Sequence, residues 1–166
     1  MKKVKLIFTT LMFLSLIQTY GQHIGMTFKD GESIGITNDS LEHIYKSAVH
    51  SDTSLAIFKT DAEQEAMGNA WQKILQDLAN FLKKNNFVWD KPTRCFHKFY
   101  FNSDGTIDYV LYNFITKDVK PENLLSVEKQ TEYNRLLNLF IKDYKFPMTA
   151  KVKFGQCGSV TFTPKK

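Results

Sequence analysis

Hydrophobic residues in the middle of the chain recur at helical spacing. Thr60 and Glu63 form a capping-box pattern before this run, and Asn85–Asn86 can end the helix in a left-handed stop. We therefore predict an amphipathic helix over residues 61–84, roughly 35 Å long. Its apolar face is built from residues three or four positions apart, namely Met67, Ala70, Trp71, Ile74, Leu75, Leu78, Phe81 and Leu82.

After Pro92 the hydrophobic spacing changes from helical to alternating. Residues 95–101 place their side chains on two faces in turn, and residues 107–112 do the same. The four residues Asn-Ser-Asp-Gly between them are turn formers, and Gly105 can take a positive φ. This pattern predicts a β-hairpin. Its aromatic side chains on both faces favour a helix over one face and a partial cover on the other.

The last part of the chain returns to a helix and then to a strand. Ser126 can cap a helix that Phe146–Pro147 ends, because the residue before proline avoids helical backbone. The apolar face of this helix holds Tyr133, Leu136, Leu137, Phe140, Ile141 and Tyr144. Residues 151–154 and 160–163 are β-friendly and are separated by a break that contains glycine.

The first part of the chain is less regular. Alternation within residues 24–36 predicts a short hairpin, residues 41–49 a short helix, and residues 55–58 a buried strand. We therefore expect an α+β fold, with an antiparallel or mixed sheet packed by two long amphipathic helices and a ββαβ order in the carboxy-terminal half. Residues 22–166 are interpreted as a single α+β domain, in which residues 22–58 are the less regular part and residues 59–166 the main core.

The first 21 residues have the layout of a signal peptide. A basic start is followed by the apolar run Leu6–Ile17 and by small or polar residues, so we expect cleavage before Gln22. No other stretch is longer or more apolar, and a membrane span needs roughly 20 apolar residues. These features predict an exported protein, periplasmic or secreted, with no membrane span after the leader is removed. No cysteine directly follows the cleavage site, which disfavours a lipoprotein.

Composition and charge narrow the range of partners. The chain has 166 residues and is 43% hydrophobic, which is enough for one domain with a core of ordinary size. Its net charge of +5 falls to +2 without the lysines of the leader, because 19 basic side chains then face 17 acidic ones. Arg94 and Arg135 are the only arginines, so phosphate-binding arginine clusters are absent and nucleic acid is not an expected partner.

The segment from residue 95 to residue 163 resembles the carboxy-terminal domain of TonB-type periplasmic proteins. The shared order is a hairpin turning on Asp104–Gly105, an amphipathic helix, the exit Phe146–Pro147 and a final strand introduced by Gly158. The resemblance implies binding of extended segments of outer-membrane proteins by addition of a strand to the sheet edge. The chain departs from energy transducers in having only 4 prolines and no long Pro-rich spacer, so force transmission is not implied.

Candidate chemistry is sparse. Residues 155–159 (Gly-Gln-Cys-Gly-Ser) resemble a papain-type nucleophile segment, but all four histidines precede them, which disfavours this interpretation. Cys95 and Cys157 are either structural thiols or a disulfide pair, and the sequence leaves both alternatives open. His43 and His50 are seven residues apart, a spacing that does not favour a metal site on a helix. No cofactor and no metal is expected.

Three functions from different classes remain open. The first is a non-enzymatic protein that binds a protein segment or another ligand through its sheet, with an envelope protein as the expected partner and Tyr100, Tyr109, Tyr112 and His97 as candidate contacts. The alternative is a small periplasmic enzyme or cystatin-like helix-on-sheet domain, with His97 as a base in a pocket between Trp71 and the hairpin. A structural subunit of a larger envelope assembly is a third class, and the oligomeric state is open.

Overall fold

The computed structural model describes residues 23–164. Its long helices are α4 (Asp61–Lys84) and α5 (Val127–Asp143), and two short helices, α2 (Phe28–Ser33) and α3 (Asn38–Glu42), precede them. The strands are β1 (Ile24–Thr27), β2 (Lys46–Ser47), β3 (Thr93–Phe101), β4 (Ile107–Phe114) and β5 (Phe154–Phe162), and two 3-10 turns span Thr53–Leu55 and Pro121–Asn123. The predicted α+β class is confirmed, with a mixed sheet of five strands.

Helix α4 begins and ends where the sequence pattern predicts. Thr60 and Glu63 form the reciprocal capping box, in which the Thr60 side chain accepts from the Glu63 N–H and the Glu63 carboxylate accepts from the Thr60 N–H. At the other end Asn85 caps the helix and Asn86 has a φ of 60°. The buried face carries Met67, Ala70, Ile74, Leu78 and Leu82.

The predicted hairpin is β3 and β4. The strands pair antiparallel from Cys95 opposite Phe114 to Phe101 opposite Ile107, with one register shift next to Tyr100. Gly105 makes the turn with a φ of 87°, and a Cβ at this position would come within 2.5 Å of the carbonyl oxygen of Phe146. Glycine is therefore required both by the backbone conformation and by the close approach of the chain that follows α5.

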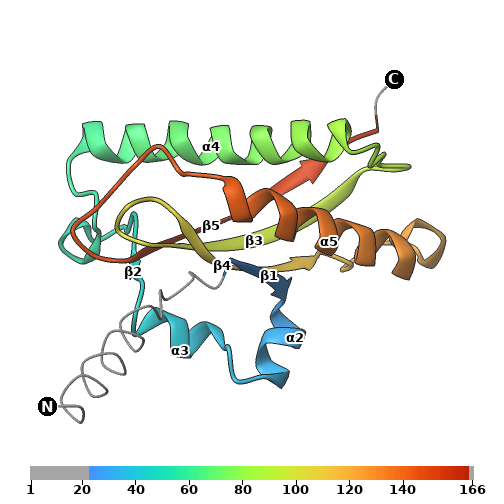
Figure 1. Ribbon diagram of the computed structural model, residues 1–166, viewed down its shortest axis with the longest axis horizontal. Helices are drawn as coiled ribbons and strands as arrows, with labels where there is room; N and C mark the ends of the chain where they lie inside the picture. The colour runs from blue at the N-terminus through green and yellow to red at the C-terminus, as the bar shows by residue number, and fades with distance from the viewer. Residues whose placement is uncertain (1–22, 165–166) are drawn as a thin grey trace, which may run out of the picture.

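The sheet has the strand order β1-β4-β3-β5-β2. The β3–β4 hairpin therefore lies inside the sheet, with β1 next to β4 on one side and β5 followed by β2 on the other. β5 pairs antiparallel with β3 along its whole length, whereas β1 is parallel to β4 and β2 is parallel to β5. The part predicted to be less regular, residues 22–58, thus supplies both outermost strands. Figure 1 shows the two long helices on one side of this sheet and α2 and α3 on the other.

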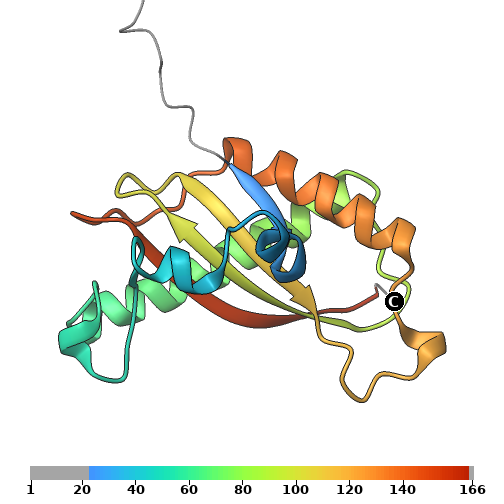
Figure 2. The same cartoon turned by 90° about the horizontal axis from the view of Figure 1, so that it is seen from below.

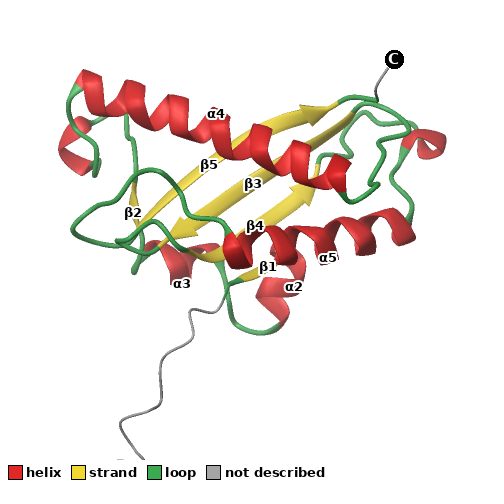
Figure 3. Cartoon of the chain, turned by 45° about the horizontal axis from the view of Figure 1, so that its top comes forward, coloured by secondary structure: helices red, strands yellow, loops and turns green. Residues whose placement is uncertain are grey.

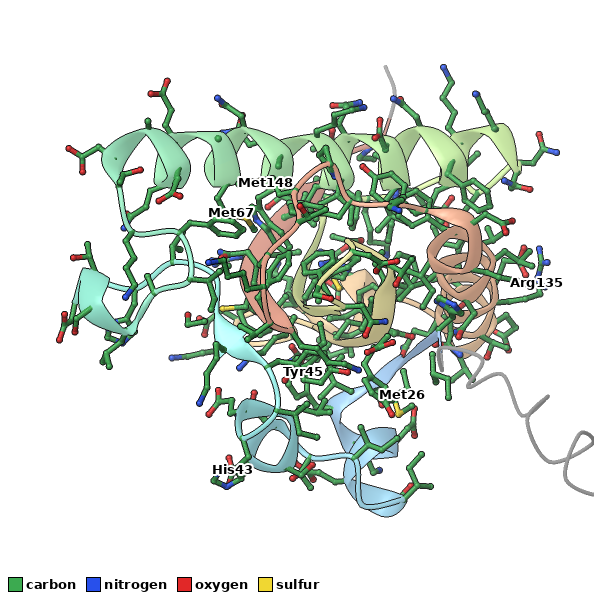
Figure 4. All side chains as sticks on the ribbon, turned by 60° about the vertical axis from the view of Figure 1, so that its left-hand side comes forward. Met26, His43, Tyr45, Met67, Arg135 and Met148 are labelled. Atoms are coloured by element: carbon green, nitrogen blue, oxygen red, sulfur yellow. The ribbon has the colours of Figure 1, made fainter. Side chains whose placement is uncertain are left out.

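The two faces of the sheet have separate cores. On the long-helix face α4 lies along the β5 side and α5 along the β1 side (Figure 3). On the opposite face α2 and α3 cover only part of the sheet (Figure 2), where Tyr45 and Met26 pack with Leu41, Tyr100 and Leu111. Figure 4 shows Met67 and Met148 between α4 and the sheet, with Met26 and Tyr45 on the other side of it.

Three local predictions for the first part of the chain are wrong. Residues 24–36 form β1 followed by α2 instead of a hairpin, because the Thr27 side chain caps a helix by accepting from the Asp30 N–H. The helix predicted over residues 41–49 ends at Glu42, and residues 46–47 form β2. Residues 55–58 form no strand and instead continue from a 3-10 turn, with Phe58 buried against Phe154.

The predicted leader, residues 1–21, lies outside the described residues. Within residues 23–164, none of the helices has both the length and the apolar character that crossing a bilayer requires.

Candidate binding edge and groove

The outer edge of β5 is paired over only a short part of its length. β2 covers Phe154 and Gly155, where the Ala48 N–H donates to the Gly155 carbonyl oxygen at 2.8 Å. Backbone groups alternate sides along a strand, so the N–H and C=O groups of Cys157, Ser159 and Thr161 also turn outward, away from β3. All three residues are exposed. β5 is therefore an edge strand from residue 156 onward.

The outward backbone groups have few partners. The Gln156 side chain donates from Nε2 to the Cys157 carbonyl oxygen at 3.0 Å, which confirms that this carbonyl faces the open edge. Within the described residues, no hydrogen bond other than the strand ladder involves the backbone of Ser159 or Thr161. The edge thus presents donors and acceptors that another strand could pair with.

This edge also lacks the features that usually block strand addition. Proteins protect edge strands with charged side chains, proline or β-bulges. Residues 156–162 (Gln-Cys-Gly-Ser-Val-Thr-Phe) contain no charged residue and no proline, and the ladder with β3 runs through nine residue pairs without a register shift. At the opposite border of the sheet, β1 is only four residues long.

A groove of about 610 Å³ lies directly beside this edge. Its floor is formed by Val160 and Phe162 of β5, and its wall by the outer face of α4. The segment Phe87–Trp89, which follows α4, closes one end; the Trp89 ring stacks on Phe162 with centroids 4.5 Å apart. Other lining residues are Gln72, Leu75, Gln76, Ala79, Asn80, Lys83, Thr161 and Thr163.

Trp71 fixes how closely α4 approaches β5. Its ring packs edge-on against Phe99, with centroids 5.5 Å apart, and lies directly over Gly158. A Cβ at Gly158 would be 2.9 Å from Trp71 Nε1, so a larger residue at this position would force the indole away. The glycine therefore positions the helix that forms the groove wall.

His97, a candidate contact and candidate base, is buried in the core. It is 0% exposed, its Nε2 forms a 2.5 Å hydrogen bond with the Tyr133 hydroxyl, and its Nδ1 has no partner within residues 23–164. Burial lowers the pKa of His97 to about 3, so the ring is neutral at physiological pH. The residue does not line the groove.

The candidate tyrosines are mostly interior. Tyr100 is covered by Tyr45 and lies in the core beneath α3, while Tyr112 packs against Tyr133 of α5 and donates to Asn134 at 3.2 Å. Burial raises the pKa of both hydroxyls. In this conformation neither side chain offers a surface to a partner. Tyr109 is half-buried, and its role in binding stays a prediction.

The two cysteines are free, so the disulfide alternative is not realised. Cys95 is opposite Val160 and faces the long helices, whereas Cys157 is opposite Lys98 and faces the other side of the sheet. Adjacent strands thus carry the two thiols on opposite faces, and no rotamer change can join them. Burial raises the pKa of the Cys95 thiol, and a hydrogen bond with Tyr133 partly offsets this effect.

The described residues contain no cluster of three or more histidine, cysteine, aspartate or glutamate side chains suited to a metal ion. His43, which ends α3, is exposed and points away from the sheet (Figure 4). His50 is also exposed, and its Nδ1 accepts from the Asp52 N–H at 3.0 Å within a local turn.

The residues of the edge and groove were missed by the sequence analysis as functional candidates. The signal available was the run of residues 156–162, whose lack of charge and proline is unusual for a strand at a sheet edge. Comparisons of this chain with protein-family models, with curated proteins and with solved structures found no match, so the resemblance to the TonB carboxy-terminal domain stays a prediction.

Proposed function

We propose that this chain is an exported, non-enzymatic binding protein of the bacterial envelope that takes up an extended segment of a partner protein as an added strand along β5. The observation that carries the proposal is the unprotected outer edge of β5 from Cys157 to Thr161. Strand addition gains affinity from main-chain hydrogen bonds, and Ser159 and Thr161 have outward groups ready to make them. Export is supported by the leader pattern of residues 1–21.

The position of the histidine favours this function over catalysis. An enzyme with His97 as a base requires the ring to line a pocket, whereas His97 is fully buried beside Tyr133 and away from the groove. Its pKa of about 3 also makes it a weak base. The open edge, by contrast, needs no rearrangement to receive a strand.

Blocking the edge tests the proposal. Because the Ser159 N–H turns away from β3, the variant Ser159→Pro removes an edge donor without breaking the ladder within the sheet. Ser159→Ala is the matched control, since it changes the side chain but keeps the donor. Both variants are first checked for folding by urea unfolding, and each is then used to capture partners from envelope extract for mass spectrometry.

We expect wild type and Ser159→Ala to capture the same protein and Ser159→Pro to lose it. Equal capture by Ser159→Pro, or no protein above background with wild type, would overturn strand addition at β5. Size-exclusion chromatography of the same three proteins detects pairing with a second copy, and a dimer that only Ser159→Pro abolishes would also count against a partner protein.

The location has its own test. Amino-terminal sequencing of the protein recovered from the envelope fraction is expected to begin at Gln22. A mature protein that retains residues 6–17 would contradict export by leader cleavage.

A further inference from the structure

The groove beside β5 has the volume and lining of a side-chain recognition site. Its volume of about 610 Å³ lies within the range of roughly 300–1,000 Å³ that is common for ligand sites, so it has room for more than one large side chain. Leu75, Ala79, Trp89, Val160 and Phe162 give it an apolar interior. Gln72, Gln76 and Asn80, one turn apart on α4, form a polar rim.

The groove is continuous with the open edge of the sheet. Val160 and Phe162 lie opposite Cys95 and Thr93 of β3 and share the face covered by α4. A strand added beyond β5 places every second side chain on that same face. Those side chains, next to Val160 and Phe162, would enter the groove, and the intervening ones would lie on the opposite face beside Ser159 and Thr161.

A second copy of this chain is a poor occupant. Paired edge to edge, it would offer the groove its own residues on the same face of β5, which are Gln156, Gly158, Val160 and Phe162. The two apolar residues are already the floor of the second copy's own groove, and Phe162 is buried in a stack with Trp89. Gln156 and Gly158 cannot fill an apolar space of this volume.

Charge on the face away from α4 favours acidic side chains there. Among the described residues, the lining of the groove includes a single charged side chain, Lys83. On the opposite face Arg94 lies beside Thr161 in the ladder, is exposed, and takes part in none of the ion pairs formed by residues 23–164. The neighbouring cation Lys98 is already paired with Glu42. An acidic side chain of an added strand could reach Arg94 across the short side chain of Thr161.

We propose that the groove between α4 and β5 selects the bound segment, which alternates large apolar side chains entering the groove with acidic side chains on the opposite face near Arg94. This inference rests on strand addition at β5 and adds the chemistry of the segment. The partner is thus recognised by a two-sided pattern, apolar toward α4 and acidic toward Arg94.

Synthetic peptides test this pattern directly. The first probe is a fluorescein-labelled peptide with the sequence Thr-Glu-Phe-Glu-Val-Glu-Phe-Thr, and two further peptides replace its apolar residues by alanine or its glutamates by lysine. Binding to the mature protein is measured by fluorescence anisotropy. We expect the dissociation constant to be at least tenfold higher for the alanine and lysine peptides than for the first probe.

Variants assign the effect to the groove and to the cation. Gln76→Phe fills the groove from its exposed rim, and Ala66→Phe, exposed on α4 outside the groove, is the matched control. Gln76→Phe should weaken binding of the first peptide at least tenfold, and Ala66→Phe should leave the affinity unchanged. Arg94→Glu should weaken binding of this peptide severalfold, and the loss of affinity should be smaller at high salt. Unfolding in urea confirms that each variant is folded.

The outcomes separate this inference from the proposed function. Equal binding of the first and alanine peptides, equal binding by wild type and Gln76→Phe, or no binding of any peptide would overturn the selectivity of the groove. If envelope capture remains sensitive to Ser159→Pro in those cases, strand addition stands and only the proposed segment chemistry fails.

Discussion

The hydroxyl group of Tyr133 and Nε2 of His97 lie 2.5 Å apart in a fully buried position between α5 and β3. The contact joins the helix to the sheet through a polar pair in the hydrophobic core, with the rings of Tyr112 and Phe162 about 6 Å from His97. Because Nδ1 has no partner within the described chain, a proton added to this ring would have to be buried without compensation.

Stability should therefore fall in mild acid. The pKa of His97 is lowered from 6.5 to about 3 by burial, so the unfolded chain binds the proton first as the pH decreases. The stability that depends on a neutral His97 ring is fully present above pH 6.5. As the pH falls from 6.5 toward 3, the free energy of unfolding decreases by at most about 1.4 kcal/mol per pH unit for this one proton. Urea unfolding between pH 7 and pH 5 measures this slope.

The variant His97→Gln is the control for that measurement. It should be less stable than wild type at pH 7 but should lose less stability between pH 6.5 and pH 5. Identical slopes for the two proteins would contradict the assignment of the acid sensitivity to His97.

Gly158→Ala should destabilise the protein by about 1–3 kcal/mol, because the new Cβ would lie 2.9 Å from Trp71 Nε1 and the indole must move. Gly68→Ala is the matched control, because Gly68 lies in α4 with nothing within 4 Å of an added Cβ. The higher helix propensity of alanine should stabilise this variant by about 0.5–1 kcal/mol. In chemical denaturation, the free energy of unfolding should therefore decrease for Gly158→Ala and increase for Gly68→Ala. An unchanged stability of Gly158→Ala would argue against the close packing of α4 on β5.

Tyr45→Phe should cost more than Tyr144→Phe. Tyr45 donates at 2.6 Å to Asp108, a buried carboxylate that also accepts from Lys153 and Asn102. Loss of this charge-assisted hydrogen bond should cost about 1.5–3 kcal/mol. Tyr144 donates at 2.9 Å to Asp77 in a more exposed position, so its removal should cost about 1 kcal/mol or less. Equal losses of stability for the two variants in thermal unfolding would mean that burial does not strengthen the hydrogen bonds to Asp108.

The two thiols should differ in reactivity. Cys157 is exposed and Cys95 is 0% exposed with its pKa raised by burial, so a water-soluble thiol reagent should modify one cysteine in the folded protein and two in denaturant. Mass spectrometry after labelling without reductant counts the modified sites. Failure to label either cysteine in denaturant would indicate a disulfide and would contradict the opposed faces of β3 and β5.

The elements predicted correctly are those whose signals are local in the sequence. The capping box at Thr60, the spacing of apolar residues in α4 and α5, and the turn at Gly105 each depend on neighbours within a few residues. Residues 24–27 form a strand, as their alternation indicates, but its partner was not predicted, and β2 was missed altogether, because both pairings are distant in the sequence: Ile24 joins Tyr109, and Lys46 joins Phe154. The two residues of β2 carry too little periodicity to be told from a loop.

The candidate site was predicted less well, for a related reason. Alternation identified the faces of β3 and β4 but could not decide which face α3 covers, so Tyr100 was expected at a surface and lies in the core. The groove combines residues of α4, the segment after it and β5, and only the three-dimensional packing brings them together. Open edges follow from strand order, which no local pattern of residues specifies.

Strand order also indicates how the protein can be handled in binding assays. β1 stands three strands away from β5, a separation of about 14 Å at the usual spacing between strands. A linker joined ahead of Ile24 would therefore leave the sheet from the border opposite the binding edge. Tethering the mature protein to a sensor surface by its amino terminus should keep β5 accessible, whereas a tag after Phe162 would sit beside the groove itself.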